Sequence, residues 1–252
     1  MAGYMSSSRG PPAPDADAHP QAGLPRQPLK EGDISMGTTI MAVTFAGGVV
    51  LGADSRTSTG SYIANRVADK ITPLSDKVYI LRSGSASDTQ AIAGYVQLYI
   101  AQHQADVNEE ITVKTAVHLA QSIAYQNKDK MQAGLILAGW DKQAGASVWA
   151  IPLGGTMLKV PYAMGGSGSA YIYGFCDKYW RSDMTEAEAK AFVVKALSHA
   201  MSRDASSGGC IRTVIIDKDG PRRDFLQGNS VPVHWEEIVA PATARLANQA
   251  AA

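Results

Sequence analysis

The helical stretches of this sequence come in pairs, and this grouping restricts the folds that the chain can adopt. Apolar residues spaced by three and four predict helices over 86–105 and 112–128, and the same spacing returns over 168–180 and 185–202. Short strand-like runs stand before, between and after the two pairs. Because the helices do not alternate with single strands, the order disfavours a doubly wound parallel sheet.

The strand-like runs follow one another through short turns, which is typical of antiparallel sheets. The runs are 39–46, 49–54, 78–82, 134–140, 147–151, 157–164, 211–217 and 224–226. Gly47-Gly48 predicts a hairpin between the first two. Thr185 and Glu188 form a predicted capping box at the start of the last helix. Two such sheets packed face to face, each with helices outside, would bury every apolar face. The predicted fold is therefore α+β, a four-layer αββα sandwich.

The composition changes sharply near residue 37. Six of the 12 prolines lie within the first 28 residues, and a segment of this kind cannot form a packed core. Acidic residues among the prolines also disfavour a transit peptide. We therefore expect residues 1–37 to be disordered, 38–235 to form the folded domain and the Ala-rich stretch 236–252 to be a C-terminal tail.

Charge and cysteine content exclude several classes of function. Lys and Arg number 23 and Asp and Glu number 23, so the balanced charge argues against nucleic acid or a membrane surface as a partner. No apolar run reaches the ~18 residues that a membrane-spanning helix needs. The two cysteines, Cys176 and Cys210, have no metal-binding spacing, and they suit a reducing compartment and buried positions.

Familiar nucleophile and phosphate motifs are missing from the chain. The string 165–169, GGSGS, is the nearest approach to GxSxG but ends in the wrong residue, and both Gly-rich phosphate motifs are absent. What remains is Gly37-Thr38-Thr39 at the boundary of the tail. If the chain were cut before Thr38, the freed amine, with a pKa of about 7.7 to 8.0, would lie within reach of the Thr38 hydroxyl. Taken alone, these three residues are weak evidence for such a nucleophile, and a plain strand start explains them better.

Four separated motifs resemble the catalytic beta subunits of the proteasome core particle. They are TTIMAVTFAGGVVLGADSRTSTGSYIANRVADKITPL at 38–74, RSGSA at 82–86, GGSGS at 165–169 with YIYG at 171–174, and RDASSGG at 203–209. The similarity covers about residues 35–235 in family order, and the pattern is closest to the beta-1, caspase-like type. It implies the αββα fold of N-terminal nucleophile hydrolases, which agrees with the layers predicted above.

The resemblance implies a threonine endopeptidase that cleaves polypeptides after acidic residues and uses no metal or organic cofactor. The implied partners are unfolded polypeptide substrates and the other alpha and beta subunits, arranged as a four-ring barrel of stacked heptamers in the cytoplasm and nucleus. Residues 1–37 would be a propeptide removed by self-cleavage between Gly37 and Thr38. Two alternatives remain, a non-catalytic structural beta subunit and a stand-alone hydrolase of the same fold that acts on a small amide.

The resemblance also implies roles for individual residues. Thr38 would be the nucleophile and, after cleavage, its amine the proton acceptor. Lys70 would lie beside Thr38, Asp54 would pair with Lys70, and the Gly84 N–H would donate to the oxyanion.

Further residues would orient the amine or select the substrate. Ser167, Asp204 and Ser207 would orient the amine, although both serines also suit turns. Arg82 would bind an acidic substrate side chain, and Thr57, Thr59 and Ala68 are further specificity residues. Ala68 stands where beta-1 relatives commonly have Thr, which makes the pocket wall less polar. The alternative for Arg82 is a surface arginine at a strand end.

Overall fold

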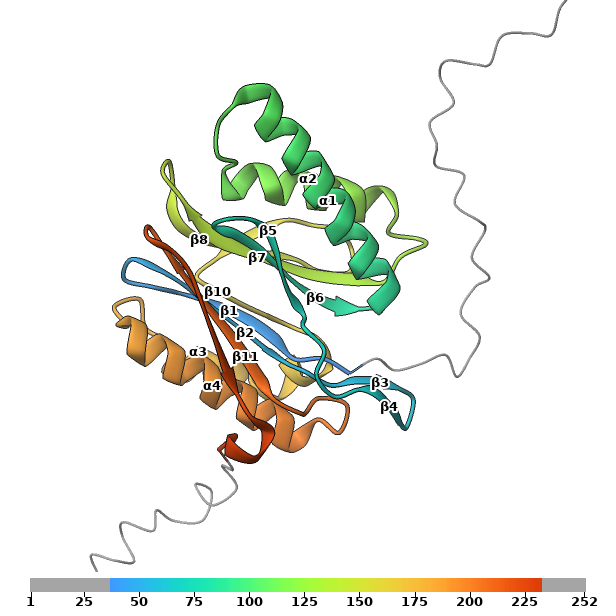
Figure 1. Ribbon diagram of the computed structural model, residues 1–252. Helices are drawn as coiled ribbons and strands as arrows, with labels where there is room; N and C mark the ends of the chain where they lie inside the picture. Colours follow the sequence, from blue (N-terminus) through green and yellow to red (C-terminus); the bar gives the residue numbers. More distant parts are fainter. Residues whose placement is uncertain (1–36, 233–252) are drawn as a thin grey trace, which may run out of the picture. The chain divides into compact units, whose positions relative to one another are not determined.

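The computed structural model describes residues 37–232, all of which lie in the unit Gly32–Ala252. The predicted tail 236–252 and all of the predicted propeptide except Gly37 fall outside the described residues. Within residues 37–232, two five-stranded sheets face each other and helices cover both outer faces (Figure 1). The predicted four-layer sandwich is confirmed.

The first sheet has the strand order β10-β1-β2-β11-β12, and all its pairs are antiparallel. Its strands are β1 Ile40–Phe45, β2 Gly48–Asp54, β10 Tyr162–Gly165, β11 Ile211–Asp217 and β12 Gly220–Leu226. The predicted hairpin forms between β1 and β2, with Phe45 paired to Gly48. Because β2 lies at the centre of this sheet, all seven of its residues are buried.

The second sheet has the order β5-β6-β7-β8-β9 and is also antiparallel. Its strands are β5 Ile71–Ser75, β6 Val78–Gly84, β7 Ala133–Asp141, β8 Gly145–Ile151 and β9 Leu158–Val160. A separate hairpin joins β3 Thr57–Thr59 to β4 Tyr62–Asn65.

Four α-helices form the outer layers of the described part of the chain. They are α1 Ala86–Val107, α2 Val113–Gln126, α3 Tyr173–Tyr179 and α4 Glu186–Arg203, with short 3-10 helices η1 Ser167–Tyr171 and η2 Gly228–Ser230. Helices α1 and α2 cover the second sheet, while α3 and α4 cover the first (Figure 1). The predicted capping box at Thr185 and Glu188 is present at the start of α4.

The apolar side chains form three clusters, one for each boundary between layers. Along β1, Met41 and Val43 face α4, whereas Ile40 and Ala42 face the second sheet, as the two-residue period of a strand requires. A third cluster lies between the second sheet and helices α1 and α2. Each apolar cluster is therefore buried between two neighbouring layers of the sandwich.

Two predicted elements differ from the structure. The single strand expected over 157–164 is interrupted at Pro161: β9 pairs with β8 in the second sheet, and β10 pairs with β1 in the first. Proline has no N–H for a strand ladder, so the chain changes sheets there. The helix expected over 168–180 is broken into η1 and α3 at Ile172. Strands β3, β4 and β5 were not predicted from the sequence.

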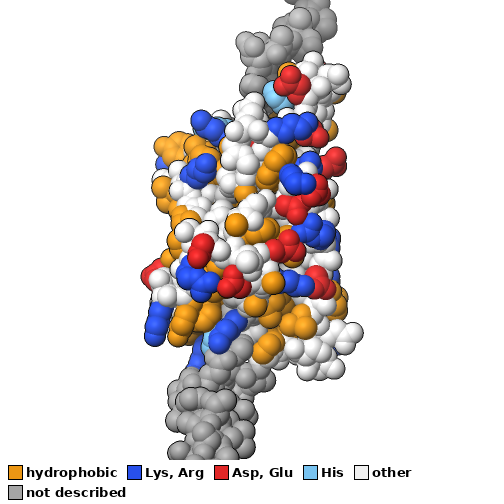
Figure 2. All heavy atoms as spheres, turned by 90° about the vertical axis from the view of Figure 1, so that its left-hand side faces the viewer, with side chains coloured by type: hydrophobic (Ala, Val, Ile, Leu, Met, Phe, Trp, Pro, Cys, Tyr) orange, Lys and Arg blue, Asp and Glu red, His pale blue; other side chains and the backbone are white. Residues whose placement is uncertain are grey.

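Lys and Arg side chains are intermingled with Asp, Glu and hydrophobic side chains on the face shown in Figure 2. No helix within residues 37–232 has the length and apolar character that a membrane span requires.

Candidate active site

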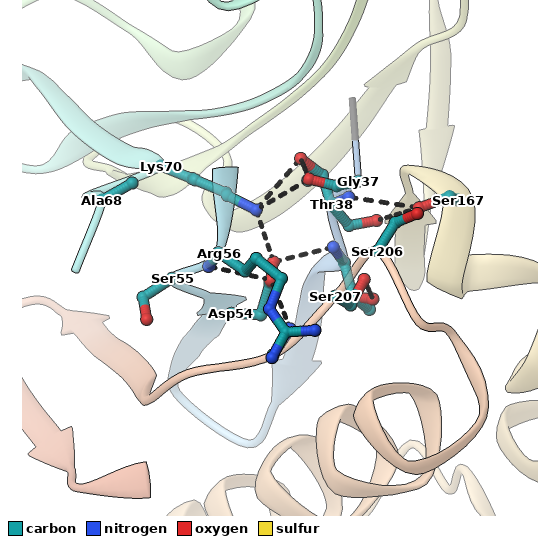
Figure 3. A network of polar contacts seen from close by, with 12 residues as sticks. Gly37, Thr38, Asp54, Ser55, Arg56, Ala68, Lys70, Ser167, Ser206 and Ser207 are labelled. Atoms are coloured by element: carbon teal, nitrogen blue, oxygen red, sulfur yellow. Dashed lines mark hydrogen bonds and ion pairs between the residues drawn. The ribbon is translucent and has the colours of Figure 1, made fainter. Parts of the chain in front are cut away.

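Thr38 lies two residues before the start of β1, between Lys70 on one side and Ser167 on the other (Figure 3). Its peptide bond to Gly37 is intact, so its nitrogen is an amide. The Thr38 Oγ1 hydroxyl donates a hydrogen bond to the Gly37 carbonyl oxygen at 2.6 Å. Lys70 Nζ donates to Thr38 Oγ1 at 3.0 Å and to the Gly37 oxygen at 3.3 Å. A hydroxyl, a carbonyl and an ammonium group therefore meet at one buried point.

Asp54, the last residue of β2, is fully buried and holds Lys70 in place. Its Oδ1 accepts from Lys70 Nζ at 2.7 Å and from the Thr39 N–H at 2.8 Å. Its Oδ2 accepts from the N–H groups of Gly208 at 3.0 Å and Arg56 at 3.2 Å. These four donors compensate the carboxylate for its loss of water. Burial lowers the pKa of Lys70 below its ordinary value, and the nearby Asp54 opposes this shift.

Asp204, which follows α4, organises the other side of Thr38. Its Oδ2 accepts hydrogen bonds from Ser167 Oγ at 2.7 Å and from Ser207 Oγ at 2.5 Å. Its Oδ1 accepts from the Ser206 N–H at 3.0 Å. The Thr38 N–H in turn donates to Ser167 Oγ at 3.2 Å. The structure thus joins Ser167, Asp204 and Ser207 in one hydrogen-bonded group, which reaches the Thr38 nitrogen through Ser167.

Gly84 ends β6 with φ 100°, a conformation that favours glycine. A side chain there would lie 2.3 Å from the Gln132 carbonyl oxygen. The Arg82 N–H donates to the Lys70 carbonyl on the β5 side, whereas the Ser85 N–H donates to Gln132 on the β7 side. Because successive strand amides point to opposite sides, the Gly84 N–H faces the side of Lys70.

A different constraint acts at Gly37, where no positive φ occurs. A side chain there would lie 2.0 Å from the Ser206 carbonyl oxygen. The close approach of Ser206 therefore requires glycine before Thr38.

A pocket of about 130 Å³ opens beside Thr38 and is lined by Lys70, Arg82 and Gly84 together with Thr57 and Ala68. Thr59 does not line this pocket and is exposed at the end of β3. Of the four specificity residues expected from the sequence, Thr57, Ala68 and Arg82 line the pocket and Thr59 lies outside it.

Arg82 is half-buried and held by two contacts that fix its direction. Its Nε donates to Thr72 Oγ1 at 3.0 Å, and its Nη2 donates to the Asp69 carbonyl at 2.8 Å. Burial lowers the pKa of Arg82, and Asp69 opposes this shift. These contacts keep Arg82 at the pocket and favour the specificity role over that of a surface arginine at a strand end.

Several site residues were missed by the sequence reasoning. The Gly37 N–H donates to Ser58 Oγ at 3.2 Å, Thr72 positions Arg82, and Thr39 Oγ1 lies 2.7 Å from Ser207 Oγ. Hydroxyl residues of this kind carry no spacing signal. Only the position of Thr39 next to Thr38 could have drawn attention to it. Among residues 37–232, no group of three or more His, Cys, Asp or Glu side chains gathers as metal ligands.

Comparison with known proteins agrees with this geometry. The family model described as proteasome subunit matches residues 34–216. The proteasome subunit beta type-6 of Arabidopsis thaliana is 52% identical over 81% of this chain and 88% of its own length. The beta type-6 subunit of Dictyostelium discoideum is 54% identical over 81% of this chain and 95% of its own. The beta type-1 subunit of Saccharomyces cerevisiae is 50% identical over 77% and 90%. The chain belongs to the proteasome subunit family.

Proposed function

We propose that this chain is a catalytic proteasome beta subunit that acts as a threonine endopeptidase and activates itself by cleavage between Gly37 and Thr38. The observation that carries the proposal is the contact of Lys70 Nζ with both Thr38 Oγ1 and the Gly37 oxygen, at 3.0 and 3.3 Å. This arrangement brings a nucleophile and a positive charge to a carbonyl that belongs to the chain itself.

Self-cleavage follows from this contact. Thr38 Oγ1 attacks the Gly37 carbonyl carbon, the peptide C–N bond breaks, and the acyl group moves to Oγ1 as an ester. A water molecule then hydrolyses the ester, which releases residues 1–37 with a carboxylate at Gly37 and leaves a free amine on Thr38. Because the precursor has no terminal amine, a water must act as the base in the first step.

In the mature subunit the freed amine takes the proton of Thr38 Oγ1 as this oxygen attacks the substrate carbonyl. The amine then passes the proton to the departing amine of the substrate, and water hydrolyses the acyl ester. The Lys70 ammonium disfavours a second positive charge on the amine and keeps it neutral. The Gly84 N–H stabilises the oxyanion. Ser167, Asp204 and Ser207 orient the amine.

The preferred substrate is an unfolded polypeptide with an acidic side chain before the cleaved bond. Arg82 supports this preference, because a guanidinium pairs with a carboxylate through two hydrogen bonds and repels Lys and Arg. Thr57 and Ala68 line the same pocket, and the methyl group of Ala68 makes the wall less polar. We place Thr59 outside this role.

We also propose that the chain assembles with other alpha and beta proteasome subunits into a four-ring barrel of stacked heptamers, in the cytoplasm and nucleus. Exposed apolar side chains on α1 support assembly, and Cys176 and Cys210, both free and buried, fit a reducing compartment. The alternative is a non-catalytic structural beta subunit. The hydrogen bonds that join Thr38, Lys70 and Asp54 favour the catalytic function.

The test is the N-terminus of the chain in assembled particles, read by mass spectrometry. The unaltered chain should begin at Thr38, whereas Thr38→Ala should retain its full length and lose peptide hydrolysis. Thr44→Ala, on β1 but outside the site, should mature normally. A Thr38→Ala chain trimmed to residue 38 would show that another protease removes the propeptide.

A further inference from the structure

Thr39 is fully buried beside the nucleophile, and its two polar groups reach both halves of the site. Its N–H donates to Asp54 Oδ1 at 2.8 Å, on the side of Lys70. Its Oγ1 lies 2.7 Å from Ser207 Oγ, on the side of Asp204. We propose that the Thr39 hydroxyl is a positioning residue that fixes the direction of the hydrogen bonds around the catalytic amine. This inference rests on the proposed threonine chemistry.

The direction of each hydrogen bond follows from counting protons. A carboxylate only accepts, so Ser207 gives its single hydroxyl proton to Asp204 Oδ2 at 2.5 Å. The oxygen of Ser207 is then left as an acceptor. Thr39 Oγ1 must therefore be the donor in the contact of 2.7 Å.

The same count of protons applies to the hydrogen bonds that lead from Asp204 through Ser167 to the Thr38 nitrogen. Ser167 gives its proton to Asp204 Oδ2 at 2.7 Å, so the Ser167 oxygen accepts from the Thr38 nitrogen at 3.2 Å. Two arms thus converge on one carboxylate oxygen. One arm begins at the Thr38 nitrogen, and the other begins at the Thr39 hydroxyl.

Thr39 therefore controls how much negative charge Asp204 presents to the amine. A hydrogen bond donated to Ser207 makes the Ser207 hydroxyl a stronger donor, because bonds in a chain polarise one another. Ser207 then withdraws more charge from Asp204 Oδ2. With less negative charge nearby, the protonated amine is less stabilised, and the neutral amine that can act as a base is favoured.

The Thr39 hydroxyl also has no room to turn elsewhere. A side chain at position 168 would lie 1.9 Å from Thr39 Oγ1, so the η1 backbone closes over this hydroxyl. Ser207 is itself buried, with 1% of its surface exposed. If Thr39 lost its hydroxyl, the acceptor on Ser207 would stay without water and would have to find another donor.

The experiment compares Thr39→Val with Thr39→Ser in assembled particles, after mass spectrometry has verified that each chain begins at residue 38. Valine keeps the size and branching of threonine and the N–H bond to Asp54, but it removes the hydroxyl. Serine keeps the hydroxyl. The substrate is a fluorogenic peptide that ends in Glu, and kcat/KM is measured across the pH range. Thr213→Val, a buried threonine on β11 outside the site, is the matched control.

We expect Thr39→Val to lower kcat/KM about tenfold, the scale of one hydrogen bond in a buried network. The acidic limb of its pH profile, where kcat/KM falls as the catalytic amine becomes protonated, should move to higher pH, because the amine of Thr38 holds its proton more tightly. Thr39→Ser should keep kcat/KM and the position of the acidic limb close to those of the unaltered enzyme, and Thr213→Val should change neither. If Thr39→Val does not assemble, Thr39→Ala takes its place, since it also removes the hydroxyl and must move the acidic limb of the pH profile in the same direction.

Two results would overturn the inference. One is a Thr39→Val particle, or its Thr39→Ala substitute, whose pH profile keeps the acidic limb of the unaltered enzyme. The other is a Thr39→Ser variant that loses as much activity as Thr39→Val, which would indicate packing alone. Both differ from failure of the proposed function, in which the Thr38→Ala particle would still hydrolyse the Glu peptide at the unaltered rate.

Discussion

At the scale of single residues, Lys70 serves both proposed steps, since its ammonium contacts the nucleophile and the carbonyl that precedes it. Lys70→Arg preserves the charge but replaces a compact ammonium with a planar fork that does not fit between Asp54 and Thr38. We expect self-cleavage and peptide hydrolysis to fall by at least ~10²-fold, the scale for losing one well-placed catalytic group. Rates measured on assembled particles check this.

Lys114→Arg, on the exposed surface of α2, is the matched control and should leave the rate unchanged. The activity of the unaltered enzyme should also depend on pH through Lys70. Because burial lowers the pKa of Lys70, the ammonium loses its proton below the ordinary 10.5, and activity should decline on the alkaline side before that pH. A Lys70→Arg particle with near-normal turnover would contradict the role of this residue.

Arg82 gives the second prediction at this scale. Thr72 and Asp69 hold its guanidinium at the pocket, so an acidic substrate side chain meets a fixed partner. Removing one member of a desolvated charge pair typically costs ~2 to 5 kcal/mol, so Arg82→Leu should reduce cleavage after Glu and Asp by well over tenfold. Cleavage after Leu should rise.

Fluorogenic peptides ending in Glu, Asp, Leu or Arg measure this change on assembled particles. Arg222→Leu, on the exposed strand β12, controls for loss of an arginine elsewhere. Unchanged acidic cleavage by Arg82→Leu would refute the specificity but leave the threonine chemistry standing.

At the scale of elements, α4 carries Asp204 at its end, and its start is fixed by the Thr185 capping box. Thr185→Ala removes the acceptor for the Glu188 N–H and should destabilise the fold by about 1 kcal/mol. The cap lies a helix length of roughly 27 Å from Asp204, so kcat should stay the same. Thermal denaturation of the full chain should show a fall of about 2–4 °C, with Thr185→Ser near the unaltered value. A loss of kcat without a loss of stability would contradict this separation.

The elements that the sequence predicted well are those with a strong period and clear ends. The β1–β2 hairpin, α2 and the capped α4 are of this kind. Strands β3 and β4 are short, and all four residues of β4 are exposed, so no apolar alternation marks them. The change of sheet at Pro161 depends on which strand pairs with the residues before the proline and which with those after it. That pairing is set by the tertiary fold.

The same distinction applies to the site. Thr38, Asp54 and Lys70 could be named because they lie in one motif that resembles a known family. The sequence could not reveal the contact between Thr39 and Ser207, which are 168 residues apart, nor the closeness of Ser206 to Gly37. Such contacts exist only once the sheets and helices have packed.

At the scale of the whole molecule, α1 presents apolar side chains outward as well as inward. Tyr95, Leu98 and Tyr99 are 54, 53 and 42% exposed, which is unusual for a helix whose other face is packed on a sheet. We expect Tyr95→Glu with Leu98→Glu to block entry into the large particle but to preserve the subunit fold. Native size separation measures this change, and Gln102→Glu, exposed on the same helix, is the control. Normal incorporation of the double variant would show that α1 is not a subunit contact.

The buried carboxylate of Asp54 has one more consequence, which concerns the timing of isotope exchange. Its oxygens hold backbone N–H groups from three separate segments, at Thr39, Arg56 and Gly208. Each amide must leave its hydrogen bond before its proton exchanges with deuterated water, and release of the carboxylate breaks all three bonds at once. The three amides should therefore exchange at one common rate. Hydrogen–deuterium exchange at any of them would then report how often the Asp54 carboxylate releases its hydrogen bonds.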